Sequence, residues 1–234
     1  MKLKTLLTLT LSTALAGFSS AATITQTQNY AFVPTASTPL TFIKFDTTLG
    51  TLLNVFVSVN LNKQRGQHEV DNDSVTGGTI SLTHEVIGDL TSAVSLVKTG
   101  GASSVGQSGS FTAISTNTGT VGPTVGDSIT SFNATLSTDY LLYNPLSATA
   151  SDSGNIDPAF INQYAFAGFQ NFVITMGATQ ISTATGTSAL QQAFTNSDID
   201  GKVTVVYEYS AVPEPTSALL GGLGALALLR RRRH

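Results

Sequence analysis

Hydrophobic and polar side chains alternate along several stretches of this chain. In LLNVFVSVNL, residues 52–61, the three valines fall on one side of an extended chain, whereas phenylalanine, serine and asparagine fall on the other. A period of two residues is typical of a β-strand that buries one face. The same alternation occurs in GTISLTHEVI, residues 78–87, and in KVTVVYEYS, residues 202–210. These three segments are therefore predicted to be strands.

Weaker alternation at residues 24–33, 91–98 and 128–138 adds further candidate strands. Clusters of Gly, Pro, Asn, Asp and Ser separate these segments, as turns do. About eight to ten short strands at this spacing predict an all-β fold, an antiparallel β-sandwich. One helix is predicted in SALQQAF, residues 188–194, with Ser188 as its N-cap. The chain has no alternating strand–helix order, which argues against a nucleotide-binding fold.

The first residues have the composition of a secretory signal peptide. Two lysines supply the positive charge, an apolar stretch follows at Leu6–Ala16, and small residues stand where signal peptidase cuts. We expect cleavage after Ala21 or Ala22. Residues 1–21 are therefore assigned to an N-terminal signal helix that takes no part in the fold, and the alternative is a buried N-terminal helix.

The C-terminal tail, residues 212–234, has three parts in order. A Pro-Glu-Pro step holds the chain extended, because proline restricts the backbone and lacks an amide donor. About twelve mostly apolar residues follow, and as a helix they would span roughly 18 Å, short of the ~30 Å hydrocarbon core. Four arginines at the end favour the cytoplasmic side. The assigned parts are a sorting motif (Pro213, Glu214, Pro215), a short membrane helix (Ala218, Leu219, Leu220, Leu223, Leu226, Leu228, Leu229) and a cytoplasmic stop (Arg230, Arg231, Arg232, Arg233).

This tail, VPEPTSALLGGLGALALLRRRR, resembles the PEP-CTERM sorting signal. In that family a membrane-embedded exosortase, an enzyme similar to cysteine transpeptidases, cuts near the Pro-Glu-Pro step. The resemblance implies that Pro213, Glu214 and Pro215 are the recognition residues. It also implies that signal peptidase and an exosortase process the protein during a transient stage at the inner membrane of a Gram-negative-type bacterium. The alternative is a plain tail anchor.

Composition narrows the possible partners and chemistry. Only 11% of the residues are charged, and six of the eleven lysines and arginines lie at the two ends. The body between them has thirteen carboxylates and five basic residues, a net charge of about −8, which argues against nucleic-acid binding. The chain has no cysteine, which excludes disulfides, thiol catalysis and cysteine-bound metals.

The segment FIKFDTTLGTLLNVFVSVNL, residues 42–61, resembles the opening of choice-of-anchor E domains, and the HEVDNDS turn and closing strand also fit. Within it, Phe45 and Leu49 are predicted to be buried, Asp46 to accept amide hydrogens in the turn, and Gly50 to adopt a positive φ. The resemblance implies a domain that occurs with varied C-terminal sorting signals and has no activity to transfer to any residue here. Residues 22–211 are accordingly expected to form one such ectodomain.

The most specific candidate for a metal site is NSDIDGKV, residues 196–203. Asn196, Asp198 and Asp200 stand at alternate positions before a glycine, as in the first half of a calcium-binding loop. The second half lacks the glutamate that such a loop has at its twelfth position, where Tyr207 stands. An acidic turn that leads into the last strand is the alternative. The sequence thus leaves open a calcium site or no cofactor.

Catalytic chemistry has little support in the sequence, and we predict no catalytic residue. His68 and His84 are the only histidines of the body, and no serine stands in a nucleophile motif. We expect HEVDNDS, residues 68–74, to be a solvated turn and His84 to be a satisfied histidine in a partly buried strand. Paired carboxylates for glycoside cleavage stay an alternative, because their spacing in space is not visible in a sequence.

Together these features predict an exported cell-envelope or extracellular-matrix protein that an exosortase sorts. Its β-sandwich is expected to be structural or adhesive and non-catalytic, with exopolysaccharide as the expected partner, an expectation that comes from family analogy. The alternative is a secreted calcium-dependent carbohydrate-binding module or a glycan-active enzyme.

Overall fold

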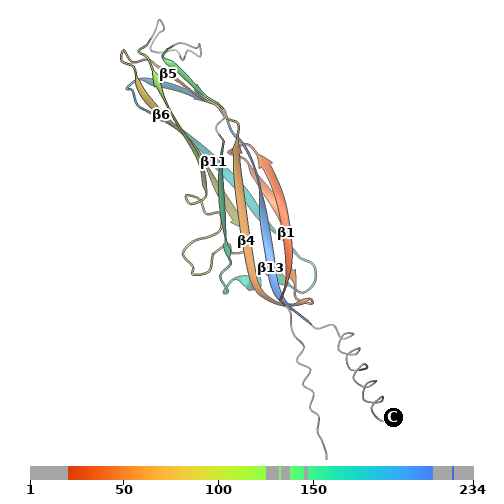
Figure 1. The fold of residues 1–234 in the computed structure, drawn as a ribbon. Helices are drawn as coiled ribbons and strands as arrows, with labels where there is room; N and C mark the ends of the chain where they lie inside the picture. Colours follow the sequence, from red (N-terminus) through yellow and green to blue (C-terminus); the bar gives the residue numbers. More distant parts are fainter. Residues whose placement is uncertain (1–20, 125–131, 133–137, 145–146, 213–222, 224–234) are drawn as a thin grey trace, which may run out of the picture.

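The computed structural model describes residues 21–124, 132, 138–144, 147–212 and 223. Thirteen β-strands and one short 3-10 helix make up the described part of the chain (Figure 1). Every strand pair is antiparallel except one short parallel pair. The predicted all-β, antiparallel class is therefore confirmed.

Sheet A contains four strands in the order β1-β13-β4-β9. Their bounds are β1 (Ala21–Phe32), β13 (Asp198–Ala211), β4 (Gly50–Gln64) and β9 (Ala148–Asn155). β13 lies inside the sheet and pairs along almost its whole length with β1 on one side and β4 on the other. The predicted strands at 24–33, 52–61 and 202–210 all lie in this sheet, and the strands are longer than expected.

Sheet B lies opposite sheet A, and a third sheet continues the molecule at one end. Sheet B has the order β2-β11-β6-β7, with bounds β2 (Ser37–Ile43), β11 (Asn171–Thr185), β6 (Gly78–Ser92) and β7 (Thr112–Val121). The tip sheet has the order β12-β5-β8, with bounds β12 (Leu190–Phe194), β5 (His68–Asn72) and β8 (Tyr140–Tyr143). The remaining elements are β3 (Phe45–Asp46), which pairs in parallel with β10 (Ala165–Phe166), and the 3-10 helix η1 (Ile161–Tyr164).

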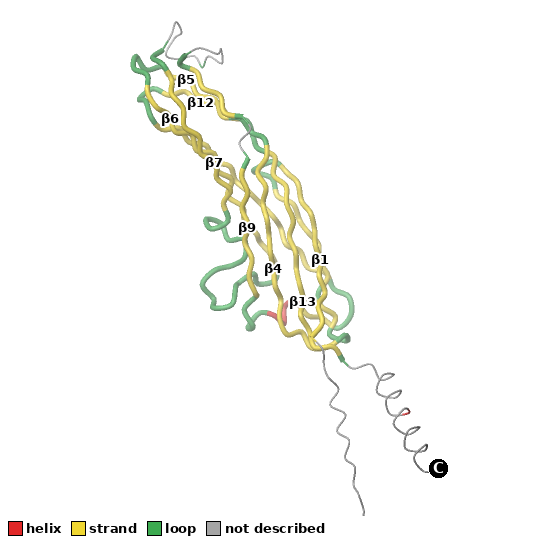
Figure 2. The backbone as a smooth tube through the Cα atoms, viewed as in Figure 1, coloured by secondary structure: helices red, strands yellow, loops and turns green. Residues whose placement is uncertain are grey.

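The alternation in the sequence decides which side chains form the core. Val55, Val57 and Val59 of β4 are buried, whereas Phe56 is exposed on the other face. Inward residues of sheet A meet inward residues of β2, β6 and β11 in one large hydrophobic cluster, as in a β-sandwich. A second, smaller cluster formed by Val70, Ile80, Leu82 and Val121 lies toward the tip sheet. The two clusters give an elongated molecule (Figure 2).

The chain enters and leaves the sandwich at the same end, opposite the tip sheet (Figure 1). Ala21, at the start of β1, pairs with Ser210 near the end of β13, and Val212 N–H donates to the Leu49 carbonyl at 3.1 Å. The predicted signal and membrane helices lie almost entirely outside the described residues. Within the described residues, no helix is long and apolar enough to cross a membrane.

Four local predictions are wrong. Residues 188–194 contain strand β12 instead of a helix, because their backbone groups pair with β5. The predicted strand at 91–98 is mostly loop, since β6 ends at Ser92. Leu49 is exposed, and residues 68–74 are a largely buried strand and turn instead of a solvated one. The predicted strand at 128–138 lies almost wholly outside the described residues.

The turn before β4 follows the prediction at its other positions. Phe45 is buried, and Asp46 Oδ1 accepts the amide hydrogens of Thr48 and Gly168 at 2.9 and 3.0 Å. These hydrogen bonds lower the pKa of the Asp46 carboxyl. Gly50 has a φ of 154°, and a Cβ at this position would collide with the Ser210 carbonyl oxygen. The glycine therefore lets β4 begin directly beside β13.

Candidate functional site

The outer face of sheet A is covered by amide and hydroxyl side chains. Because side chains alternate along a strand, each residue of β4 that follows a core valine points outward. The strand register then aligns these outward residues in rows across the sheet. Two central rows, which we call the amide face, are Asn29, Lys202, Asn60 and Ser151, and Ala31, Asp200, Asn62 and Thr149.

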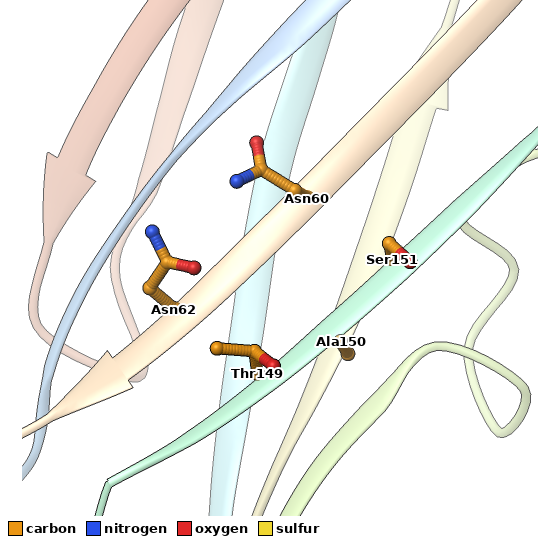
Figure 3. Close-up of a pocket in the computed structure, with 5 residues that line it drawn as sticks. All are labelled: Asn60, Asn62, Thr149, Ala150 and Ser151. Atoms are coloured by element: carbon orange, nitrogen blue, oxygen red, sulfur yellow. The ribbon is translucent and has the colours of Figure 1, made fainter.

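Three neighbouring hollows open on the amide face. The first, of about 310 Å³, is lined by Asn60, Asn62 and residues 149–151 (Figure 3). The second, of about 400 Å³, shares Asn60 and Asn62 and adds Asn29, Lys202 and Asp200 from the neighbouring strands. The third, of about 390 Å³, continues along β13 past Asp200 to Asp198 and Arg65. Shared lining residues make the three hollows one continuous surface.

Hydrogen bonds between strands hold the side chains of this face in place. Asn60 Oδ1 accepts the backbone N–H of Lys202 at 2.9 Å. Asp200 accepts from Asn62 Nδ2 at 2.8 Å and from Gln64 Nε2 at 2.5 Å. The Lys202 side chain is exposed and is the basic group of the first row, between Asn29 and Asn60. The face thus presents positioned donors and acceptors without a deep cavity.

Tyr30 and Gly201 support the amide face from beneath. The Tyr30 hydroxyl donates to the Asn60 carbonyl oxygen at 2.5 Å, and its ring passes over Gly201. A Cβ at Gly201 would collide with both the Asn60 carbonyl oxygen and the Tyr30 ring. Burial and the nearby Asp200 carboxylate raise the pKa of Tyr30 well above its usual value, so the hydroxyl stays a donor at physiological pH.

The residues predicted as a calcium site are only partly brought together. Asp198 and Asp200 lie two residues apart on the outer face of β13, whereas Asn196 precedes the strand. Asp198 forms an ion pair with Arg65 at 2.9 Å, and both Asp200 oxygens already accept amide hydrogens. Within the described residues, no group of three or more His, Asp or Glu side chains lies close enough to hold a metal ion.

A second polar cluster, which no sequence pattern predicted, lies inside the sandwich. Lys63 continues the inward side of β4 and is only 1% exposed. Its Nζ donates to His84 Nδ1 at 2.9 Å, to the His84 carbonyl oxygen at 3.0 Å and to Ser115 Oγ. Burial lowers the pKa of Lys63 to about 8, and burial together with Lys63 and His68 lowers the pKa of His84 to about 4.

The glutamates that could support glycoside cleavage are separated in the fold, and the two histidines lie in the interior. His68 and His84 are both buried. Glu69, Glu85 and Glu208 lie on β5, β6 and β13, which belong to three different sheets. The described residues therefore bring no two glutamates onto one face.

Aromatic side chains that could stack on a sugar are also separated. Tyr140 and Tyr143 lie in the tip sheet, whereas Tyr164, Phe166 and Phe169 lie near the opposite end.

Residues 211–233 match the family model of the PEP-CTERM protein-sorting motif. The predicted recognition of this signal is confirmed, and the chain carries a PEP-CTERM motif directly after strand β13. The motif indicates export to the envelope or surface of a Gram-negative bacterium and processing by an exosortase. Pro213, Glu214, Pro215 and the four arginines lie outside the described residues. Of the assigned membrane segment only Leu223 is described, and its side chain is exposed.

Comparisons with whole proteins add no further relationship. No curated protein matches the chain. Three solved structures from infectious bursal disease virus, a T13 viral particle, the Gx strain and a VP2 subviral particle, are 12%, 13% and 13% identical to it. The matches cover 85%, 82% and 92% of this chain, and 41%, 38% and 48% of the viral chains. Their TM-scores are 0.16, 0.14 and 0.14. These scores carry no conclusion about fold or function.

Proposed function

We propose that this protein is a non-catalytic envelope or matrix protein whose amide face binds exopolysaccharide. The observation that carries the proposal is the continuous surface of three hollows, in which Asn60, Asn62 and Asp200 are each shared by two hollows. A polysaccharide offers a repeating array of hydroxyl groups. Positioned amides, hydroxyls and one lysine on a broad sheet face can match such an array with many hydrogen bonds.

The shape of the surface favours a polymer over a small ligand. A site for a small molecule is usually one enclosed, mostly apolar cleft with a few polar groups. The amide face instead crosses all four strands of sheet A, and its two central rows consist mostly of residues with polar side chains. Each contact is weak, and affinity would come from many contacts along one chain. This role fits a protein that an exosortase delivers to the cell surface.

Binding can be tested by co-sedimentation of the purified protein with exopolysaccharide from the producing cells. We expect the double variant Asn60→Ala/Asn62→Ala to lose at least about tenfold in affinity, which is the effect of losing two to three modest hydrogen bonds. Thr183→Ala is the matched control, because Thr183 is an exposed strand residue on sheet B. Equal binding by both variants would refute the role of the amide face.

We also propose the finer steps of export. Signal peptidase removes residues 1–21, the tail is held briefly in the inner membrane, and an exosortase cuts near Pro213–Pro215. Intact mass of the envelope-associated protein tests these steps. A species that begins at Ala22 or Thr23 and ends near the Pro-Glu-Pro step is the expected result. A full-length C-terminus, or an unchanged mass and location in cells without the exosortase, would support a plain tail anchor instead.

The relation of the body to choice-of-anchor E domains remains part of the proposal. This relation is supported by the turn in which Asp46 accepts two amide hydrogens and Gly50 begins the long strand β4.

The competing function is a calcium-dependent carbohydrate-binding module. It is favoured by one observation, since Asp198 and Asp200 line a hollow of the same face. A glycan-active enzyme has no comparable support among the described residues.

A further inference from the structure

Exposed apolar side chains gather at the end of the sandwich where the chain enters and leaves. We call Leu49, Phe166, Phe169 and Val212 the end face, and all four side chains are exposed. Phe169 is 72% exposed, which is unusual for a phenylalanine in a folded domain. Neighbouring exposed apolar residues of this kind often mark a surface that contacts another apolar phase.

Backbone hydrogen bonds place these four residues next to one another. The Thr47 N–H donates to the Phe166 carbonyl oxygen, and the Leu49 N–H donates to the Asp46 carbonyl oxygen, both at 3.1 Å. Gly168 N–H donates to Asp46 Oδ1, which fixes the loop that carries Phe169. The Val212 N–H donates to the Leu49 carbonyl oxygen at 3.1 Å. The end face is therefore a fixed part of the fold.

An apolar hollow of about 280 Å³ adjoins the end face. Leu49, Ile43, Phe45 and Ile24 line it, with Lys44 as the basic residue at its side. The Asp46 carboxylate nearby already accepts amide hydrogens from Thr48 and Gly168. Lys44 and Asp46 thus bring one positive and one negative charge to this hollow, and the local net charge of zero leaves its apolar surface accessible to lipid.

The sequence after Val212 ties this end of the sandwich close to a bilayer. The apolar run begins at Ala218, six residues beyond Val212, and even a fully extended chain of that length spans only about 20 Å. When the apolar run is inserted, the end face cannot lie farther than this from the membrane surface. This tether is short enough for the exposed phenylalanines to reach the headgroup region, where apolar and aromatic side chains enter a bilayer.

We propose that the end face rests on the lipid surface while the tail is inserted, with Phe166 and Phe169 in the boundary between headgroups and acyl chains. This inference depends on the proposed membrane stage of the tail. Docking holds the sandwich upright, with the tip sheet away from the bilayer and the Pro-Glu-Pro step at the interface. The partner is a phospholipid bilayer.

The absence of cysteine allows a direct test with single labels in the full chain. Ala167→Cys, between the two phenylalanines, and Val75→Cys, 83% exposed near the tip sheet, each receive an environment-sensitive fluorophore. Both proteins are reconstituted in vesicles of phosphatidylethanolamine and phosphatidylglycerol. We expect the label at position 167 to shift its emission to the blue and to be quenched by spin-labelled lipid, whereas the label at 75 stays in water.

The same label in the background Phe166→Ser/Phe169→Ser separates docking from insertion of the tail. We expect this variant to float with the vesicles but to lose the blue shift and the quenching. The inference is overturned if the label at 167 behaves as the label at 75 does while the protein floats. If no variant floats, the proposed membrane stage fails as well, and the two failures are thereby distinguished.

Discussion

The side-chain amide of Gln26 pairs with the backbone of Ile43 as a neighbouring strand would. Its Nε2 donates to the Ile43 carbonyl oxygen at 2.7 Å, and its Oε1 accepts the Ile43 N–H at 2.9 Å. Gln28 Nε2 repeats the contact with the Thr41 carbonyl oxygen at 3.1 Å. Strands β1 and β2 are edge strands of sheets A and B. These side chains therefore satisfy backbone groups that would otherwise lack a partner at the seam, which is where the two edge strands meet.

Gln26→Leu is expected to destabilise the sandwich by about 1–2 kcal/mol, because two hydrogen bonds are lost and water only partly replaces them. The midpoint of urea unfolding measures this loss. Thr25→Val is the control, since Thr25 is the neighbouring residue on the outer face of β1. If both variants unfold at the same urea concentration, the seam does not depend on the amide.

Because the pKa of His84 is lowered in the folded protein, we expect the protein to lose stability in mild acid. This pKa is lowered from 6.5 to about 4, so the unfolded chain binds the proton more readily than the folded protein between these pH values. Stability present above pH 6.5 is therefore lost as the pH falls toward 4, by about 3 kcal/mol for the full shift. Protonation at Nδ1 would also remove the acceptor for Lys63 and place two cations in contact. Urea unfolding at pH 7, 5.5 and 4.5 tests this slope.

His84→Gln is the matched variant for that measurement, because its amide oxygen can still accept from Lys63 but does not titrate. We expect its stability to vary less than that of the unchanged protein between pH 6.5 and 4.

At alkaline pH the direction of the change in stability is set by Lys63, whose pKa is lowered from 10.5 to about 8. The unfolded chain holds this proton more tightly, so stability should rise between about pH 8 and 9.5, below the pH at which buried tyrosines with a raised pKa, such as Tyr30, reverse the trend. A fall over that range would contradict the assignment.

Two glycine positions distinguish close backbone contact from ordinary strand packing. Gly201→Ala places a Cβ against the Asn60 carbonyl oxygen and the Tyr30 ring, and we expect a loss of about 1–3 kcal/mol. Gly177→Ala, in β11, makes only ordinary contacts at 3.9 Å and should be neutral or slightly stabilising. Thermal unfolding of both proteins provides the comparison. Equal destabilisation would mean that Gly201 has no special role beneath the amide face.

Calcium is expected to leave the melting temperature unchanged. Asp198 is paired with Arg65, and both oxygens of Asp200 accept amide hydrogens, so a cation would have to displace existing partners. A specific site would add about 2.7 kcal/mol at a calcium concentration a hundred times its Kd. A rise in melting temperature that disappears in Asp200→Asn would establish the calcium-dependent alternative.

Periodicity in the sequence was sufficient to predict the long strands and their buried faces. Val55, Val57 and Val59 are buried as predicted, and His84 shares the inward face of β6 with Ile80 and Leu82. In contrast, β12 was mistaken for a helix, since five residues with two glutamines show no clear period and only pairing with β5 makes them a strand. Short segments depend on partners that are distant in the chain.

The internal cluster and the amide face differ in how far they could be predicted. Lys63 occupies the inward side of β4 two residues after Leu61, so a buried lysine could have been expected from alternation. Its contact with His84 and Ser115 depends on how the two sheets are placed, which no local pattern gives. The rows of the amide face likewise depend on strand register. The sorting signal was predictable because its three parts are contiguous in the sequence.

The position of β13 determines how the sandwich meets mechanical load. The tail follows directly from this strand, which is paired with β1 over twelve residues and with β4 over fourteen. A surface protein that is held by a polymer on its sheet and pulled through its C-terminus is loaded along the axis of β13. Such a pull strains the ladders on both flanks together, in shear, instead of opening them one bond at a time. The strand that joins the sandwich to its sorting signal is thereby also the one best placed to resist extraction.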